Sequence, residues 1–308
     1  MGKTIIVQPS TKHYQELAQE HYEYLLQLGY NAQSCRNRWR RLLEFLRYAE
    51  TTITTDITAI TTKDILQFYE YIQNRPSKRN GSVLSKKTVW DFMQAVQNFY
   101  TMLQHKNKIQ INPTNTIQIK YENTESPRTA LTQDEIQELY RHTKTLQEKA
   151  ILALGYGCGL RVSEIVQCNI EDVRIREQIL IVPKGKFNKS RTVPMSKTVV
   201  KDLANYFYKE RLQQESKDPK AFILHSRLRR MQKGTYNEIL QKLISRTGNE
   251  SIKMKQISIH NLRHSIATHL IEQGVPLERV REFLGHSQLE STEVYTHISK
   301  IQLQKLVV

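Results

Sequence analysis

Three segments in the C-terminal half of the 308-residue chain combine glycine with Arg, His or Tyr at positions where a protein core would prefer apolar groups. They are Gly-Cys-Gly-Leu-Arg-Val-Ser-Glu at 157–164, His-Asn-Leu-Arg-His at 260–264, and Leu-Gly-His at 284–286, with Tyr295 nine positions after His286. A guanidinium stays protonated and offers a planar fork to two oxygens, which suits an anion. A phenol oxygen can act as a nucleophile. These residue types therefore suit attack on an anionic substrate.

The same segments resemble the tyrosine recombinase family, also called the lambda-integrase or phage integrase family, and in particular its Xer-like members. The family pattern is Gly-Leu-Arg-x-x-Glu, His-x-x-Arg, Leu-Gly-His and a tyrosine in a Tyr-Thr-His-like context, and every element is present in order. A single His-x-x-Arg arises by chance in many helices, whereas four ordered elements do not. The resemblance covers residues 128–298, and more loosely the N-terminal region with which family members clasp DNA.

The resemblance implies a site-specific recombinase that cleaves and rejoins DNA through a 3′-phosphotyrosyl intermediate and a Holliday junction, without a cofactor. A phosphodiester adds charge to its nonbridging oxygens in the transition state. We therefore expect Arg161 and Arg263 to clamp the scissile phosphate, with His260 adding a hydrogen bond. The alternative for Arg161 is a structural salt bridge with Glu164. Glu164 matches a frequent acidic position of the family and is expected to orient Arg161 or the histidines.

Tyr295 is the predicted nucleophile, because its distance from Leu-Gly-His selects it among fifteen tyrosines. A phenol has a pKa of about 10, so nearby cations and a proton acceptor must help it ionise during attack. The alternative is one more aromatic core residue. The resemblance also implies that His286 binds a nonbridging oxygen or orients the nucleophile.

The departing 5′ oxygen needs a proton, which a lysine on a β-hairpin turn supplies in the family. Lys186 is the predicted general acid, within Gly-Lys-Phe-Asn-Lys-Ser-Arg at 185–191. Phe187 replaces the usual glycine of that turn, and Lys184 and Lys189 are the other candidates. The alternative is a solvated basic turn that touches DNA nonspecifically. His264, His269 and His297 occupy no motif position and are expected to pack or to lie at the surface, and no metal site is predicted.

Helical periodicity dominates the elements that must position these residues. Apolar spacing predicts four N-terminal helices, over 14–28, 34–50, 62 to the residues before Pro76, and 85–104. Residues 112–128, rich in Asn, Thr and Pro, read as a linker, and a capping box of Thr132 and Glu135 starts the second domain. There, helices are predicted at 150–157, 197–213, 235–245, 260–273 and 277–284, with a hairpin of 178–183 and 191–195. The expected fold is mainly α with a small β-sheet: a core-binding helical domain at 1–111, a linker at 112–128 and a catalytic domain at 129–308.

The chain carries 46 Lys and Arg against 30 Asp and Glu, a formal charge of +16, which favours a polyanionic partner. Double-stranded DNA carrying a recombination site is the predicted partner. The basic residues expected to meet its phosphates are Arg36, Arg40, Arg41, Arg79, Lys86 and Lys87. The three cysteines lack paired spacing and are read as reduced packing residues. No signal peptide or membrane span is recognised, so a cytoplasmic, nucleoid-associated protein is expected.

Assembly and biological role are further expectations. By resemblance, the apolar C-terminal segment 296–308 docks on a neighbouring protomer of a DNA-bound homotetramer, the alternative being its own domain. A partner recombinase or accessory protein is a further expected partner. Integration or excision, inversion and dimer resolution all remain open. A type IB topoisomerase and a DNA-binding regulator without catalysis are the competing functions; the Leu-Gly-His motif argues against the first and the intact residue set against the second.

Overall fold

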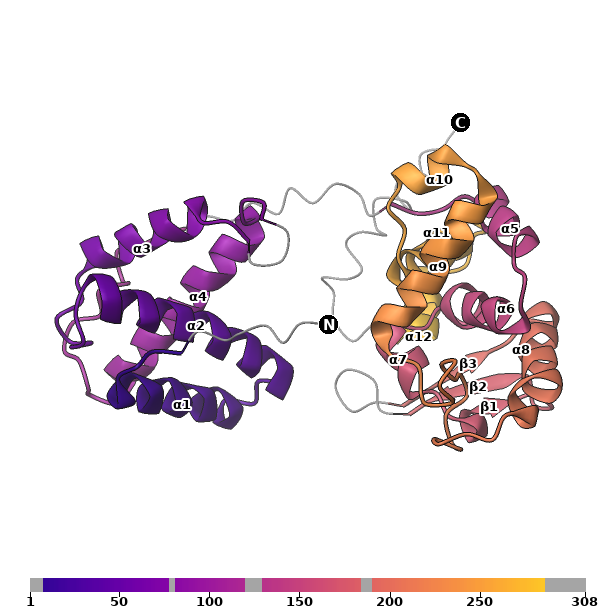
Figure 1. Cartoon of the computed structure of the whole chain (residues 1–308), viewed down its shortest axis with the longest axis horizontal. Coiled ribbons are helices and arrows are strands. Elements are labelled where there is room, and N and C mark those ends of the chain that lie inside the picture. Colours follow the sequence, from indigo (N-terminus) through magenta and orange to yellow (C-terminus); the bar gives the residue numbers. More distant parts are fainter. Residues whose placement is uncertain (1–7, 78–80, 120–128, 184–189, 286–308) are drawn as a thin grey trace. The chain divides into compact units, whose positions relative to one another are not determined.

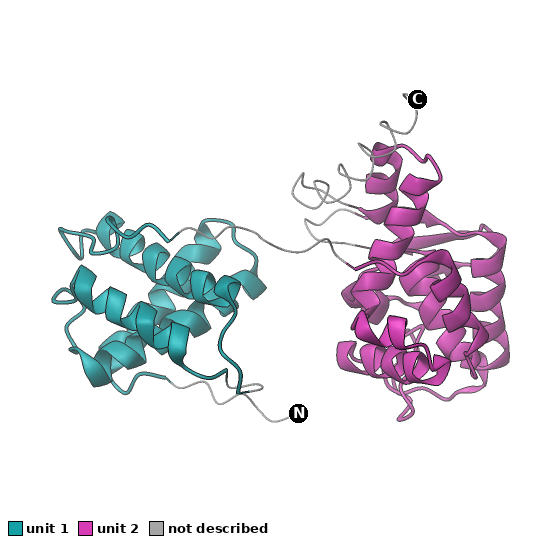
Figure 2. Cartoon of the chain, turned by 90° about the horizontal axis from the view of Figure 1, so that it is seen from above, with its two compact units in different colours: residues 1–124 teal, residues 125–308 magenta. Residues whose placement is uncertain are grey.

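The computed structural model describes residues 8–77, 81–119, 129–183 and 190–285. The chain forms two compact units, residues 1–124 and 125–308, drawn in teal and magenta in Figure 2. Each unit has a hydrophobic core of its own. The mainly helical fold with a small sheet that the sequence predicts is confirmed.

Unit 1 contains the four predicted helices, α1 (Lys12–Gln27), α2 (Ala32–Thr52), α3 (Thr62–Asn74) and α4 (Lys86–His105) (Figure 1). Local hydrogen bonds fix where three of them begin, because the side chains of Asn31, Thr61 and Ser85 each accept a backbone N–H of the first turn. Aromatic rings fill the core between the helices, with Phe45 in edge contact with both Phe68 and Tyr100. Unit 1 is thus an apolar-packed helical bundle.

The segment after α4 belongs to unit 1 as far as it is described. Ile117 is buried and Ile119 packs against the same core, although 112–128 was expected to be a linker. The buried side chain of Asn112 accepts hydrogen bonds from the backbone and the hydroxyl of Thr114. The Asn, Thr and Pro content of this stretch therefore reflects a turn packed on the bundle as well as a connection. Residues 120–128 lie outside the described part.

Unit 2 is built mostly from helices. They are α5 (Gln133–Arg141), α6 (Leu146–Leu152), the π-helix η1 (Ala153–Gly157), α7 (Val162–Gln167), η2 (Ile170–Asp172), α8 (Lys197–Lys209), η3 (Arg211–Gln213), α9 (Lys233–Thr247), α10 (Glu250–Met254), α11 (Ile259–Glu272) and α12 (Leu277–Leu284). The predicted capping box starts α5: Glu135 donates its backbone N–H to the Thr132 hydroxyl, and Thr132 donates its own to the Glu135 carboxylate. The helices predicted in this unit are present with two differences: the end of 150–157 takes the π form, and the helix predicted over 197–213 ends at Lys209 and is followed by the 3-10 helix η3.

A three-stranded antiparallel sheet in the order β1-β2-β3 completes unit 2. The predicted hairpin arms are β2 (Ile179–Val182) and β3 (Arg191–Pro194), paired from Ile179 opposite Pro194 to Val182 opposite Arg191. A short strand that the sequence did not predict, β1 (Val173–Arg174), pairs with β2. Leu180, Val182 and Val193 face the core. The sheet therefore holds Arg191 at the start of β3.

Helix α11 packs against η1, α9 and α12. It buries Leu262, Arg263, His264 and His269.

Within the described ranges, none of the helices is both long and apolar enough to cross a membrane. The three cysteines are buried and unpaired, and burial raises the pKa of the Cys158 thiol to about 12.

Candidate active site

A π-helix and a glycine turn place Arg161. After η1, the backbone N–H of Cys158 donates to the Ala153 carbonyl and that of Leu160 to the Leu154 carbonyl. Gly159 then adopts a φ of +59°, and a side chain there would lie 2.9 Å from the Leu284 side chain. The turn puts Arg161 immediately before α7. Glycine is required here by both the left-handed backbone and the close approach of α12.

Three arginines surround the carboxylate of Glu164, which is 7% exposed. Arg191 reaches both carboxylate oxygens at 2.9 Å, a bidentate pair. Arg161 contributes its Nη1 at 2.9 Å and its backbone N–H at 2.8 Å, and Nη1 of Arg263 lies 3.7 Å away. Three positive groups face one negative group. The cluster therefore keeps an excess of positive charge that suits an anion.

The charge of Glu164 is held firmly. Burial alone would raise the pKa of its carboxyl, but hydrogen bonds and charge from Arg191, with a backbone hydrogen bond from Arg161 and the charge of Arg263, lower that pKa to about 2. A carboxylate with such a pKa cannot take up a proton during a reaction near neutral pH. Its contacts fit the orienting role expected from the sequence. The salt bridge to Arg161 is present too, and the Arg161 side chain remains 26% exposed.

Arg263 is the most enclosed member of the cluster, with only 2% of its surface exposed. It donates from Nη1 to the carbonyl oxygen of Gly159 and from Nη2 to that of Leu284, each at 2.6 Å. The first carbonyl precedes Arg161 by two residues, and the second ends α12. Arg263 thus joins the three motif segments that the sequence singled out. Its two hydrogen bonds hold these segments together, in addition to the contact with a phosphate that is expected of Arg263.

The second motif glycine, Gly285, brings the end of α12 against Arg191. It has a φ of +66°, and a side chain at this position would lie 2.7 Å from Cδ of Arg191. Arg191 donates from Nε to the Phe283 carbonyl, and Nη2 of Arg161 lies 3.5 Å from the Gly285 carbonyl oxygen. Gly285 is therefore the residue through which the described part of Leu-Gly-His contacts the arginine cluster. The segment that would carry His286 and Tyr295 starts beside the arginine cluster.

His260 lies in the first turn of α11 and is exposed, while His264 one turn later is 5% exposed. Their Nε2 atoms are 3.2 Å apart, and their rings meet edge to face with centroids 4.6 Å apart. His264 was expected only to pack or to lie at the surface. It is buried, as that expectation allows, and it also contacts the ring predicted to touch the phosphate.

The structure brings Arg161, Glu164 and Arg263 together and places His260 on the helix of Arg263. Lys186, His286, Tyr295 and Arg79 lie outside the described residues. Sequence reasoning gave no role to Arg191, although the Gly-Lys-Phe-Asn-Lys-Ser-Arg match ends on this residue. That final arginine was the available signal.

The candidate DNA-binding residues of unit 1 fall into two groups. Arg36, Arg40 and Lys86 are exposed on α2 and at the start of α4. Arg41 instead pairs with Asp91 at 2.8 Å, and Lys87 reaches the same carboxylate at 3.0 Å while lying over the Trp90 ring. Asp91 thus neutralises part of the positive charge of Arg41 and Lys87. We expect Arg41 and Lys87, which share Asp91, to contribute less to phosphate binding than Arg36, Arg40 and Lys86.

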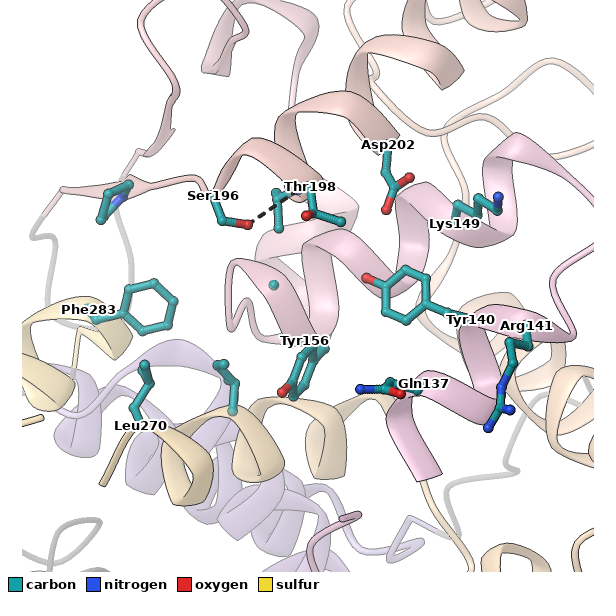
Figure 3. Close-up of a pocket in the computed structure, with 14 residues that line it drawn as sticks. Gln137, Tyr140, Arg141, Lys149, Tyr156, Ser196, Thr198, Asp202, Leu270 and Phe283 are labelled. Atoms are coloured by element: carbon teal, nitrogen blue, oxygen red, sulfur yellow. Dashed lines mark hydrogen bonds between the residues drawn. The ribbon is translucent and has the colours of Figure 1, made fainter. Parts of the chain in front are cut away.

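A separate cavity of about 710 Å³ lies in unit 2 between α5, α6, η1, α8, α11 and α12. Figure 3 shows Tyr140, Tyr156, Leu270 and Phe283 arranged around it, with Gln137 and Asp202 at its polar positions. The Tyr156 hydroxyl lies 2.9 Å from Nδ1 of His269 on α11. Among the residues that the structure describes, the lining includes none of those predicted to be catalytic. Its aromatic and aliphatic lining suits an apolar segment better than an anion.

Comparisons with known proteins point to one family. Residues 129–301 match the Phage integrase family. The tyrosine recombinase XerD of Listeria innocua serovar 6a is 28% identical over 286 residues, which cover 91% of this chain and 93% of the relative. The tyrosine recombinase XerC of Caldanaerobacter subterraneus subsp. tengcongensis is 30% identical over 263 residues, or 82% of this chain and 70% of the relative.

Solved structures share the fold. The Tn1549 transposon integrase in complex with transposon right end DNA has a TM-score of 0.72 at 19% identity, covering 95% of this chain and 99% of that one. The XerH site-specific recombinase bound to a palindromic difH substrate has a TM-score of 0.66 at 17% identity, covering 97% and 89%. The chain therefore belongs to the phage integrase family, and it is a tyrosine recombinase, an enzyme of site-specific DNA recombination.

Proposed function

We propose that the arginine cluster binds the scissile phosphate of a DNA recombination site and that Tyr295 attacks its phosphorus. The observation that carries this proposal is the convergence of Arg161, Arg191 and Arg263 on the single carboxylate of Glu164. The net positive charge would stabilise the added charge on the nonbridging oxygens. Arg161, the more exposed of the motif arginines, is the one best placed to reach a phosphate.

Covalent attack would form a bond between phosphorus and the phenol oxygen of Tyr295, whose proton would pass to a neighbouring acceptor such as water, and would break the bond between phosphorus and the 5′ oxygen, giving a 3′-phosphotyrosyl link. Lys186 would give a proton to the departing oxygen, while His260 and His286 would donate hydrogen bonds to the phosphate. The reverse attack by a 5′ hydroxyl of the partner DNA would free Tyr295 and pass through a Holliday junction. The energy of the broken bond is kept in the phosphotyrosyl ester, so rejoining needs no nucleotide cofactor.

A homotetramer on DNA is the assembly that we propose, with segment 296–308 docking on a neighbouring protomer. The cavity of Figure 3 supports this, because its lining residues Tyr156, Leu270 and Phe283 offer apolar surface to an apolar segment. A chain shortened to end at residue 298 would then bind a DNA site but fail to form the tetramer in sedimentation velocity. Tetramers of unchanged stability would instead favour docking of this segment on its own domain.

The names of the relatives suggest a cellular role. Several curated relatives are named as Xer recombinases, and related structures are those of a transposon integrase and of XerH. We infer a cytoplasmic enzyme of the nucleoid that acts in dimer resolution or in movement of a small mobile element. A partner recombinase or accessory protein is part of this proposal.

The test is trapping of the covalent intermediate. The protein is incubated with nicked suicide duplexes that carry candidate sites from beside its own gene, in EDTA and without ATP, and is analysed on denaturing gels. We expect an adduct with the wild type and none with Tyr295→Phe. The matched control is Tyr208→Phe, which removes the hydroxyl of a half-exposed tyrosine on α8 and should leave the adduct unchanged. An adduct that persists in Tyr295→Phe would refute the nucleophile. Tight DNA binding without any adduct would favour a DNA-binding regulator without catalysis.

A further inference from the structure

We propose that His264 is a positioning residue that fixes which ring nitrogen of His260 carries the proton. The inference rests on the proposed role of His260 as a hydrogen-bond donor to the scissile phosphate. It concerns a residue outside the recognised motif positions. Its basis is the contact between the Nε2 atoms of the two rings at 3.2 Å.

The geometry makes the contact a defined one. The two histidines lie four residues apart on α11, so that their side chains share one face of the helix. His264 is buried and its ring is held edge to face against His260, with centroids 4.6 Å apart and planes at 80°. His260 is exposed. One ring therefore belongs to the interior and the other to the surface of unit 2.

Proton counting leaves few states for such a pair. A neutral imidazole has one N–H and one acceptor nitrogen. At an Nε2-to-Nε2 hydrogen bond between neutral rings, only one of the two atoms carries a proton. If His264 donates, neutral His260 keeps its proton on Nδ1. If His260 donates, its Nδ1 bears a lone pair.

A phosphate discriminates between these two states. A phosphate oxygen brought beside Nδ1 of His260 is attracted by an N–H and repelled by a lone pair. Donation from the buried His264 is therefore the state that prepares His260 to donate to substrate. A second partner of this kind commonly sets the tautomer of a functional histidine. His264 would do so from within the same helix.

The tautomer can be measured directly on the full chain, without DNA. Uniform ¹⁵N-histidine labelling and long-range ¹H–¹⁵N correlation near neutral pH distinguish a proton on Nδ1 from one on Nε2, and His260→Gln assigns the resonances. We expect the Nδ1–H form of His260 in the wild type. In His264→Leu we expect a shift to the Nε2–H form that free histidine favours in water. In His264→Gln, whose amide nitrogen takes the place of Nε2, we expect the Nδ1–H form to be restored.

Activity gives an independent readout. The rate of adduct formation on the nicked duplex should fall about 10- to 100-fold in His264→Leu, by analogy with the loss of a partner that orients a metal-bound histidine. It should recover at least in part in His264→Gln. Urea unfolding of both variants shows whether a loss reflects stability alone, because a merely structural role would not change the tautomer.

The outcomes separate this proposal from the proposed function. An Nε2–H form of His260 in the wild type, or the same tautomer in all three proteins, would overturn the role of His264 whatever the activity. Equal loss of cleavage in the Leu and Gln variants with the tautomer intact would also overturn it. Absence of any adduct with the wild type would contradict the proposed function and leave the tautomer result standing.

Discussion

Glu164 is a single acidic residue on which the positions of three arginines depend. Its carboxylate joins Arg161 at the start of α7, Arg191 on β3 and Arg263 on α11. In Glu164→Gln the shape is kept but the charge is lost, and the arginines then repel one another without compensation. Breaking a buried ion pair in this way costs about 3 to 5 kcal/mol. Urea unfolding followed by circular dichroism at pH 7 would measure the loss.

The same variant should show a particular pH dependence. The pKa of Glu164 is about 2 in the folded protein, below its ordinary value of 4.5. The stability that this carboxylate contributes is therefore complete above about pH 4.5 and is lost as pH falls from there toward 2. The difference between wild type and Glu164→Gln should narrow over that range. The control Glu177→Gln removes an exposed partner of Arg174 and should cost about 1 kcal/mol or less. A difference independent of pH would contradict the assigned pKa.

At the level of residues, the sequence predicted types and order better than contacts. Arg161, Arg263 and Glu164 are brought together as the spacing of the motifs suggests. Arg191 was given no role, and His264 was expected only to pack or to lie at the surface. The contacts of these two residues depend on segments distant in sequence or on ring orientation. Arg191 reaches Glu164 from a strand 27 residues away. No local pattern records which carboxylate an arginine will meet.

At the level of elements, α11 connects the start of unit 2 to the site. Along one face, Asn261 donates to the Thr129 carbonyl, Ser265 accepts the Leu131 N–H, and Nε2 of His269 lies 2.9 Å from the Leu131 carbonyl oxygen. The same helix carries His260 and Arg263. The predicted linker ends at residue 128. The residues that follow it are thus hydrogen-bonded to α11.

His269 makes this connection testable. It bonds both the Leu131 carbonyl and the Tyr156 hydroxyl, so His269→Phe leaves two polar groups without a partner and should destabilise unit 2 by about 2 to 4 kcal/mol. Burial lowers the pKa of His269. Its contribution is therefore complete above the ordinary histidine pKa of about 6.5 and decreases as pH falls below it. Urea unfolding at pH 7.5 and 5.5 should show a smaller difference between the two proteins at the lower pH. The control Ser265→Ala should lose stability equally at both.

Elements were predictable where amphipathic periodicity is strong, as in the four helices of unit 1 and in α11 and α12. The π form of η1 was not, because its apolar residues have the spacing of an ordinary buried helix. Its glycines Gly155 and Gly157 lie against side chains of α11 and α8, and such contacts between distant segments leave no local pattern. Strand β1 was also missed, because two residues carry no readable alternation.

At the level of the whole molecule, the formal charge of +16 predicts a strong salt dependence of DNA binding. Each neutralised phosphate releases counterions, so the slope of log K against log salt is about −0.9 per contact on duplex DNA. Arg40→Gln removes an exposed cation of α2 and should reduce the magnitude of that slope by about 1. Arg41→Gln should change it less, because Asp91 already pairs with that guanidinium.

Fluorescence anisotropy on a labelled duplex between about 50 and 300 mM salt would measure the slope for both variants. The control is Lys12→Gln, which changes an exposed lysine of α1. Equal slopes for Arg40→Gln and wild type would remove Arg40 from the DNA contacts, and a slope near zero for the wild type would contradict phosphate binding as the source of affinity.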